Sequence, residues 1–280
     1  MSEFLAIMAA PFAASLVVTG IHVYLGLHVV RRGVIFVDIA LAQIAALGAA
    51  FAFLFGMELH GGEAYWVSLA FTLIGAVIFS ITRSRRARIP QEAFIGIVYA
   101  VSAAAAILVV DRAPGGAEHV KDLLVGSLLF VQWGTVVKTA LLYALIGILH
   151  WLWRKPLWEI SNMNEWEKGQ GRRPWIWDLF FYSTFGFVVN ASVGIAGVLL
   201  VFSYLVVPAV CAMLLVERTA NGAVKVGKSL CVGWLVGFLV SVAGCYLSYY
   251  WDLPTGATIV VTFGAALVLI GIIRKLFLVA

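Results

Sequence analysis

Charge is scarce in this 280-residue chain, because only 12% of its residues are Asp, Glu, Lys or Arg while 63% are apolar. An ordinary globular domain carries about 25% charged residues, so this composition excludes a soluble protein built around one core. Cysteine is rare too: Cys211, Cys231 and Cys245 are isolated and form no CxxC pair, which leaves small buried apolar side chains as their expected role. The few polar residues within the apolar stretches also disfavour an intramembrane enzyme, which would need a serine dyad or a histidine paired with an acid.

Long stretches have no charge at all, and a membrane-spanning helix needs about 20 mainly apolar residues. The longest run, 179–216, has 38 residues and would be about 57 Å long as one helix, nearly twice the roughly 30 Å hydrocarbon core of a bilayer. It is expected to form two spans joined by a tight turn near Gly194 and Gly197. The sequence therefore predicts an all-α polytopic membrane protein, a single transmembrane domain over residues 1–280, with about nine helices, or eight if one is re-entrant. The expected spans are about 5–30, 34–56, 64–82, 93–110, 133–153, 177–195, 198–216, 229–250 and 256–273.

The basic residues are distributed unevenly between the two sides of these spans. Sixteen of the nineteen Lys and Arg residues fall on one side, and loops rich in Lys and Arg face the cytoplasm. This bias predicts an outside N-terminus, a cytoplasmic C-terminus and a multi-pass location in the inner (plasma) membrane. The net charge of +5 is thus a sign of topology and not of nucleic-acid binding. The first apolar segment lacks the basic start of a cleaved signal peptide and is expected to be retained.

The longest polar stretch is a cytoplasmic loop expected at about 154–176. Its tryptophans suit an amphipathic segment at the membrane surface. One interpretation is a docking element for a cytoplasmic partner, with Glu159, Trp166 and Glu167 as its contact residues. The other is an interfacial loop anchored by its aromatic side chains. The composition favours neither the docking element nor the interfacial loop.

Four stretches, in matching order and spacing, resemble one transporter family. Arg31–Gly48 is similar to the pattern RR-apolar-F-G-D-x-L-A-H-x-x-L-x-G, and Arg88–Tyr99 to an acidic helix start x-E-x-x-I-G-I-V-F. Gly194–Leu214 resembles G-V-L-L-V-x-x-L-L-I-I-P-A-x-x-A, and Leu247–Ala257 resembles L-S-Y-x-x-D-x-P-x-G-A. In the last stretch, Asp252 is expected near the N-cap of the final span, with Pro254 in its first turn. Together these patterns resemble the integral-membrane permease subunit of the ATP-driven importers for zinc, manganese and iron.

The resemblance implies a function as well as a fold. It implies a homodimeric permease that performs no chemistry itself and binds no cofactor, with ATP hydrolysis on separate cytoplasmic ATPase subunits. It also implies an extracytoplasmic metal-binding protein as a partner and a divalent metal ion, zinc or manganese, as the transported substrate. Two alternatives stay open. One is a permease of the same architecture for another substrate, and the other is an ATP-independent channel or secondary transporter.

The chain departs from the family pattern where that pattern would bind metal. The family has an acid four residues before a histidine, so that both side chains share one helix face. Aligned on Leu41 and Ala42, Gln43 occupies the histidine position, while Asp38 occupies a glycine position. Five residues correspond to about 500° of rotation, which leaves the Asp38 and Gln43 side chains about 140° apart in a regular helix. Asp38 and Gln43 are therefore candidate pathway residues, and Asp38 is also a candidate metal ligand, but the two do not form a complete metal site.

Other polar residues in the apolar stretches are candidates for the same pathway. His22 and His28 lie on the first expected span, each either a ligand or a hydrogen-bonded histidine, and Asn190 and Ser192 lie in the middle of the long apolar run. His60 and His119 are expected outside the membrane as a first metal site or as ordinary loop residues. The main alternative for Asp38 is an ion pair with Arg31 or Arg32.

Overall fold

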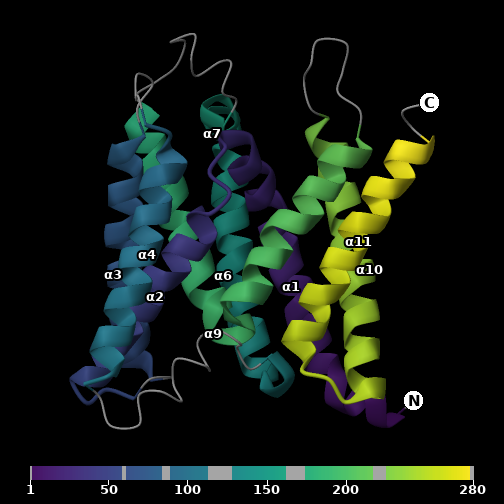
Figure 1. The fold of residues 1–280 in the computed structure, drawn as a ribbon, viewed down its shortest axis with the longest axis horizontal. Helices are drawn as coiled ribbons and strands as arrows, with labels where there is room; N and C mark the ends of the chain where they lie inside the picture. Colours follow the sequence, from purple (N-terminus) through teal and green to yellow (C-terminus); the bar gives the residue numbers. More distant parts are fainter. Residues whose placement is uncertain are drawn as a thin grey trace. The chain divides into compact units, whose positions relative to one another are not determined.

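The computed structural model describes residues 2–58, 61–83, 89–112, 128–161, 174–216 and 225–277, and this part of the chain is almost entirely helical (Figure 1). Eight of its helices are long and apolar enough to cross a membrane, which confirms the predicted all-α polytopic class. The elements are α1 (Ser2–Arg32), α2 (Val37–Leu54), α3 (Gly62–Thr82), α4 (Gln91–Val110), η1 (Leu128–Phe130), α6 (Trp133–Leu152), α7 (Arg154–Ser161), α9 (Pro174–Leu215), α10 (Val226–Trp251) and α11 (Thr255–Phe277).

The chain divides into two compact units that interleave along the sequence. Unit 1 comprises residues 1–30, 127–141 and 199–280, and unit 2 comprises residues 31–126 and 142–198. Helices α1, α6 and α9 each contribute residues to both units. The two units are described separately below.

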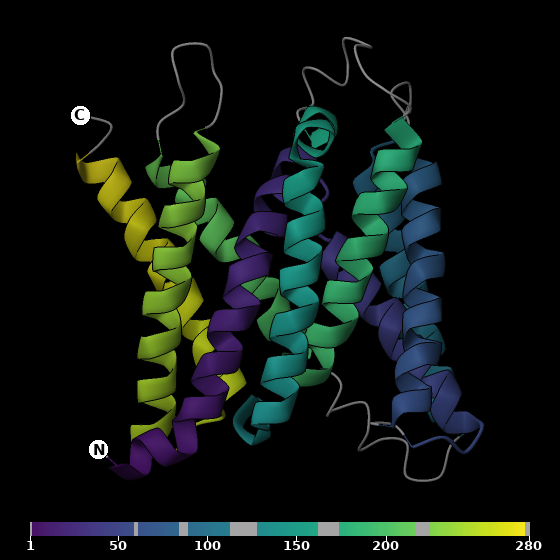
Figure 2. The ribbon, with the colours of Figure 1, turned by 180° about the vertical axis from the view of Figure 1, so that it is seen from behind.

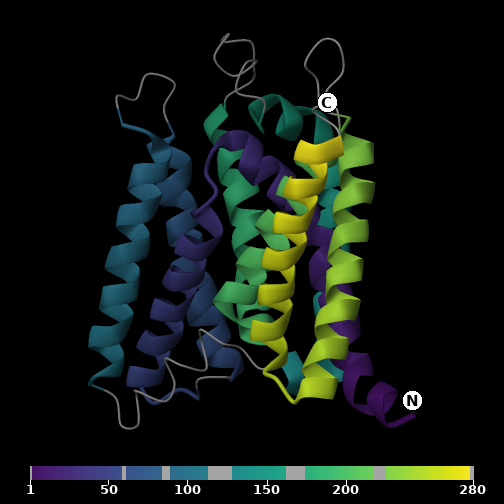
Figure 3. The ribbon, with the colours of Figure 1, turned by 45° about the vertical axis from the view of Figure 1, so that its right-hand side comes forward.

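Unit 2 is organised around α2, which packs against both α3 and α4 (Figure 3). Small residues allow the close approach. A Cβ on Gly48 would lie 2.8 Å from the Ser68 Cα, and one on Gly75 would lie 2.4 Å from the Ile44 Cδ1. Because lipid tails are as apolar as leucine, membrane helices associate through such tight packing rather than through the hydrophobic effect. These contacts fix the position of α2, which carries Asp38.

Unit 1 holds α10 and α11 side by side, together with residues 2–30 of α1, whose earlier part lies against α10 (Figure 2). The approach of α1 and α10 again uses glycine, since a Cβ on Gly237 would lie 2.5 Å from the Thr19 Cγ2. The start of α1 and the end of α11 lie at opposite ends of this unit (Figure 1). Lys225 at the start of α10 and the basic pair Arg274 and Lys275 at the end of α11 share the end opposite the N-terminus. The sequence likewise predicts these basic residues on the same side of the spans.

The long apolar run 179–216 contains a break, as the sequence predicts. It falls at Gly197, whose torsion angles of φ 75° and ψ 162° are not helical. A positive φ is readily adopted by glycine but is strained for other residues. The other glycine expected at the reversal, Gly194, keeps helical geometry. Counted as two segments, α9 brings the eight apolar helices of the described ranges to the nine expected.

Two local expectations are wrong. Asp252 is not near the N-cap of the last span: it ends α10 in the left-handed conformation, with φ 51°, and Pro254 precedes α11 instead of lying within it. Ser248 stabilises this turn, because its backbone carbonyl accepts a hydrogen bond from the Leu253 N–H and its hydroxyl donates to the Leu253 carbonyl. Cys211 and Cys245 are buried as expected, but Cys231 is exposed.

Candidate functional site

The segment between α1 and α2 positions the candidate metal ligand. Gly33 has φ 67°, which ends α1, and α2 begins four residues later at Val37. The N-cap residue Phe36 has no capping bond from its own side chain. Instead, the Phe36 N–H donates a 3.0 Å hydrogen bond to Glu92 Oε1 in the first turn of α4. A carboxylate from a neighbouring helix thus caps α2 two residues before Asp38.

Replacing Glu92 with alanine tests this capping. The loss of a capping acceptor costs about 1 kcal/mol, with a range of roughly 0.5–2 kcal/mol, so we expect Glu92→Ala to lower the unfolding free energy of the purified protein in detergent by about that amount. Glu63→Ala is the matched control, because Glu63 is an exposed acid in the first turn of α3. An equal loss in the two variants would contradict a special role for Glu92.

Asp38 is almost completely buried, with 1% of its surface exposed. Its Oδ1 has no hydrogen-bond partner among the residues that the structure describes. The ion pair considered for Arg32 is formed with Asp178 instead, at 2.8 Å. Asp38 lies close enough to Tyr143 for the two groups to interact electrostatically. A buried carboxylate oxygen without a partner is costly, so the fold maintains Asp38 at an energetic cost.

Gln43 is also buried, with 8% of its surface exposed. The helix is uninterrupted from Val37 to Leu54, so the divergence of about 140° between Asp38 and Gln43 expected from helix geometry applies. The two side chains lie on different faces of α2. A shared metal site made by α2 alone is therefore excluded.

Asn190, on α9, is held by a partner that the sequence did not reveal. Ser68 Oγ lies 2.6 Å from the Asn190 side-chain amide and 2.7 Å from the Ala45 carbonyl oxygen. One hydroxyl proton cannot serve two acceptors, and the Asn190 Nδ2 as placed has no partner among the described residues. Since amide oxygen and nitrogen are assigned from the hydrogen-bond network, the consistent assignment has Asn190 donating to Ser68 and Ser68 donating to Ala45. The side-chain oxygen of Asn190 can then accept a further hydrogen bond.

Ser192 lies two residues further along α9 and is fully buried. Its hydroxyl is hydrogen-bonded to the Tyr143 hydroxyl, which also lies 3.2 Å from the Val188 carbonyl oxygen. Tyr143 thus connects Ser192 with the surroundings of Asp38. We call Asp38, Ser68, Tyr143, Asn190 and Ser192 the polar cluster of unit 2. Its Ser68–Asn190 and Tyr143–Ser192 pairs lie on faces of α9 about 160° apart, because Asn190 and Ser192 are two residues apart along the helix. The cluster includes three of the predicted pathway residues together with two, Ser68 and Tyr143, that apolar periodicity does not distinguish from packing residues.

The predicted histidines belong to the other unit. His22 and His28 lie on the unit 1 part of α1, and both are completely buried. His22 Nδ1 lies 2.8 Å from the Val18 carbonyl oxygen, and the His28 ring packs edge-on against Tyr24. Within the described ranges no group of three or more His, Cys, Asp or Glu residues is placed to hold a metal ion. His60 and His119 lie outside the described residues.

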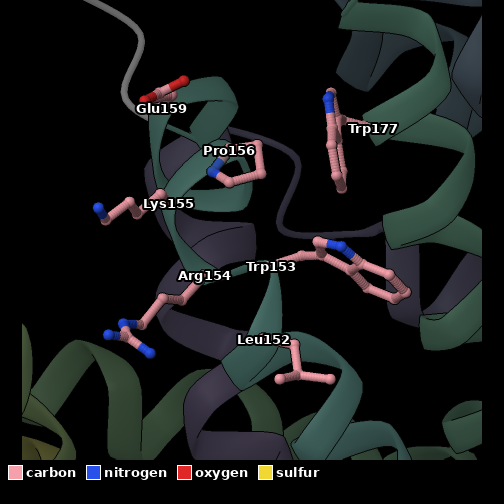
Figure 4. Close-up of a pocket in the computed structure, with 7 residues that line it drawn as sticks. All are labelled: Leu152, Trp153, Arg154, Lys155, Pro156, Glu159 and Trp177. Carbon is pink, nitrogen blue, oxygen red and sulfur yellow. The ribbon is translucent and has the colours of Figure 1, made fainter.

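The expected cytoplasmic loop at 154–176 is partly helical, because α7 occupies its beginning and α9 starts at Pro174. Leu157 and Ile160 are buried while Arg154 and Glu159 are exposed, as in an amphipathic surface helix. Glu159 helps to line a cavity of about 500 Å³ (Figure 4). The lining residues are Leu152, Trp153, Arg154, Lys155, Pro156, Glu159 and Trp177. The other two expected docking residues, Trp166 and Glu167, lie outside the described residues.

The chain is similar to several membrane proteins of metal transport systems. Its sequence is 24% identical over 246 residues to a probable iron transport system membrane protein of Haemophilus influenzae, covering 88% of this chain and 82% of the relative. It is 28% identical over 193 residues to the manganese transport system membrane protein MntB of a Synechocystis strain, covering 69% and 60% of the two chains.

Solved structures share the fold. The complex of PsaBC from Streptococcus pneumoniae with an Fab contains a chain that matches with a TM-score of 0.75 at 20% identity, covering 96% of this chain and 94% of that one. An inward-facing putative metal-chelate type ABC transporter matches with a TM-score of 0.68 at 17% identity, covering 98% and 90%. The family model described as the ABC 3 transport family matches residues 4–275. The chain therefore belongs to the ABC 3 transport family.

Proposed function

We propose that this chain is the membrane-spanning permease subunit of an ATP-driven importer for a divalent transition-metal ion. The observation that carries the proposal is Asp38, a buried carboxylate with an unpartnered oxygen in an apolar helix of an ABC 3 family chain. Ionisable residues within membrane spans are rare and typically mark ion or substrate pathways. The residues of the polar cluster of unit 2 form the corresponding part of the pathway.

Manganese fits this pathway better than zinc. Asp38 and the neighbouring Tyr143 and Ser192 offer carboxylate and hydroxyl oxygens, and the described residues of the cluster include no imidazole and no thiolate. Oxygen ligands suit manganese, whereas zinc favours histidine and cysteine. The names of the relatives support the same choice, since they refer to manganese and iron transport systems. Iron(II) is the second candidate, because the name of one relative refers to iron transport.

The proposal includes partners and an orientation. Cytoplasmic ATPase subunits would bind at α7, where Glu159 is exposed, and at the segment that follows α7. An extracytoplasmic binding protein would deliver the metal. The permease would act as a homodimer in the inner (plasma) membrane, with its N-terminus outside and its C-terminus in the cytoplasm. The basic residues that end α11 and begin α10 at one end of unit 1 support this orientation.

Transport by the reconstituted assembly tests the proposal. The chain, its ATPase subunit and its binding protein are placed in liposomes, and uptake of radioactive manganese is measured with and without ATP. We expect uptake to require ATP, to stop with a hydrolysis-deficient ATPase subunit, and to be inhibited less by zinc than by iron(II). Uptake without the ATPase subunit would instead identify a channel or secondary transporter, and preferential inhibition by zinc would overturn the choice of metal.

A further inference from the structure

Two buried arginines converge on one carboxylate oxygen at one end of unit 2. Asp178 Oδ1 accepts hydrogen bonds from Arg32 Nη1 at 2.8 Å and from Arg83 Nη1 at 2.5 Å. The exposed fractions of the three side chains are 0% for Arg32, 6% for Arg83 and 2% for Asp178. The group therefore connects the end of α1, the residue that follows α3 and the first turns of α9.

The same two arginines also hold the last turn of α7. Arg32 Nε donates a 2.9 Å hydrogen bond to Ser161 Oγ, and Arg83 Nη2 donates a 2.7 Å hydrogen bond to the Ile160 carbonyl oxygen. Cations are favourable at a helix C-terminus, where backbone carbonyls lack intrahelical partners. Each guanidinium thus bonds α7 on one side and Asp178 on the other. We call Arg32, Arg83, Ser161 and Asp178 the arginine joint.

The arginine joint is expected to add little net free energy to the stability of the fold. Two cations share one anion, and all three charged side chains are removed from water. The Arg32 guanidinium is also packed 3.8 Å from the centre of the Phe181 ring. Removing charges from water is costly, and apolar residues of similar volume often stabilise a protein as well or better than a buried ion pair. The best-attested use of such groups is to fix one arrangement of elements against another.

Its position in the chain indicates which elements it fixes. Ser161 is the last residue of α7, and Asp178 lies one turn into α9, so the two residues flank the segment 162–173 proposed to contact the ATPase subunit. Arg32 ends α1, and Asp38 follows six residues later in α2. A displacement of α7 relative to α9 must therefore strain the bonds of Arg32, and with them the segment that leads to Asp38.

We propose that the arginine joint transmits movement of α7 to the α1–α2 segment, so that ATP hydrolysis on the partner subunit is coupled to metal movement past Asp38. This inference rests on the proposed function. Asp178 acts here as a positioning residue, since it contacts neither the metal nor the nucleotide. Without it, the two arginines repel each other and release α7 from α9, while α7 and its exposed face remain available to the ATPase subunit.

The ratio of ATP hydrolysed to metal transported tests the arginine joint. In the liposome assembly, we expect Asp178→Asn to keep the ATPase subunit bound and hydrolysing ATP while manganese uptake falls, so that the ratio rises about tenfold or more, as expected when coupling free energy between sites is lost. Asp111→Asn is the matched control, because Asp111 is an exposed acid at the C-cap of α4. We expect it to leave the ratio unchanged.

A second variant covers the case in which Asp178→Asn does not fold. Ser161→Ala removes the hydrogen bond between Arg32 and α7, together with the bond from the Ser161 hydroxyl to the Leu157 carbonyl within α7, and leaves both bonds to Asp178 in place. We expect a smaller rise in the same ratio. Uptake and hydrolysis that fall in proportion in both variants would show a purely structural role and overturn the inference. A wild-type assembly without ATP-dependent uptake would instead refute the proposed function, which keeps the two failures distinguishable.

Discussion

Gly26→Ala is expected to destabilise the protein more than any other single-methyl addition in α1. A Cβ at this position would lie 1.9 Å from the Leu205 carbonyl oxygen and 2.9 Å from the Leu205 carbonyl carbon. Both atoms belong to the backbone of α9, so no side-chain rotation can relieve the clash and the helices of unit 1 must separate. Overpacking a well-packed core costs about 1–3 kcal/mol and occasionally more, and we expect the upper end of that range. The unfolding free energy in detergent is the measurement.

Gly20→Ala provides the control within the same helix. Gly20 lies on α1 six residues earlier, and a Cβ there would meet no atom within 4 Å. Alanine is a better helix former than glycine by about 1 kcal/mol, so this variant should be unchanged or slightly more stable. The packing of α1 against α9 at Gly26 would be refuted if both variants lost equal stability, or if Gly26→Ala melted like the wild type.

Most of the fold can be predicted from the distribution of charge. The spans expected at about 93–110 and 133–153 correspond to α4 (Gln91–Val110) and α6 (Trp133–Leu152), because bilayer thickness and helix rise fix both the length and the composition of a spanning segment. The break in α9 was also predictable from its length. Its location at Gly197 and not Gly194 was not, since both glycines permit it and only tertiary packing selects one.

The polar contacts could be predicted only in part. Asn190 and Ser192 stand out as polar residues in an apolar run, but their partners Ser68 and Tyr143 come from distant parts of the sequence. The distribution of charge does not single out Asp178, because this residue stands at the very start of the expected span 177–195 and immediately before the uncharged run. A signal was present: proline is favoured in the first turn of a helix, so Pro174 indicates a helix that begins before Asp178.

Asp38 is proposed to bind the transported metal, and its burial lowers the stability of the fold. Asp38 lies in the first turn of α2 and is buried away from water, and the described residues leave one of its oxygens unpartnered, which is costly for a carboxylate. Two explanations of the residue therefore make opposite predictions about stability. A structural ion-pair member would stabilise the fold, whereas a carboxylate kept for a passing cation would destabilise it.

Asp38→Asn separates these explanations, because asparagine has nearly the same shape without the charge. We expect the apparent Kd for manganese, taken from the concentration dependence of uptake, to rise at least about tenfold, which corresponds to 1.4 kcal/mol of lost binding free energy. Removing a buried charge relieves its desolvation cost, so the melting temperature of the purified protein should rise in the same variant. Gln43→Ala, on another face of α2, removes a neutral side chain and should weaken uptake less. A lower melting temperature with unchanged uptake in Asp38→Asn would identify Asp38 as structural and exclude it from the pathway.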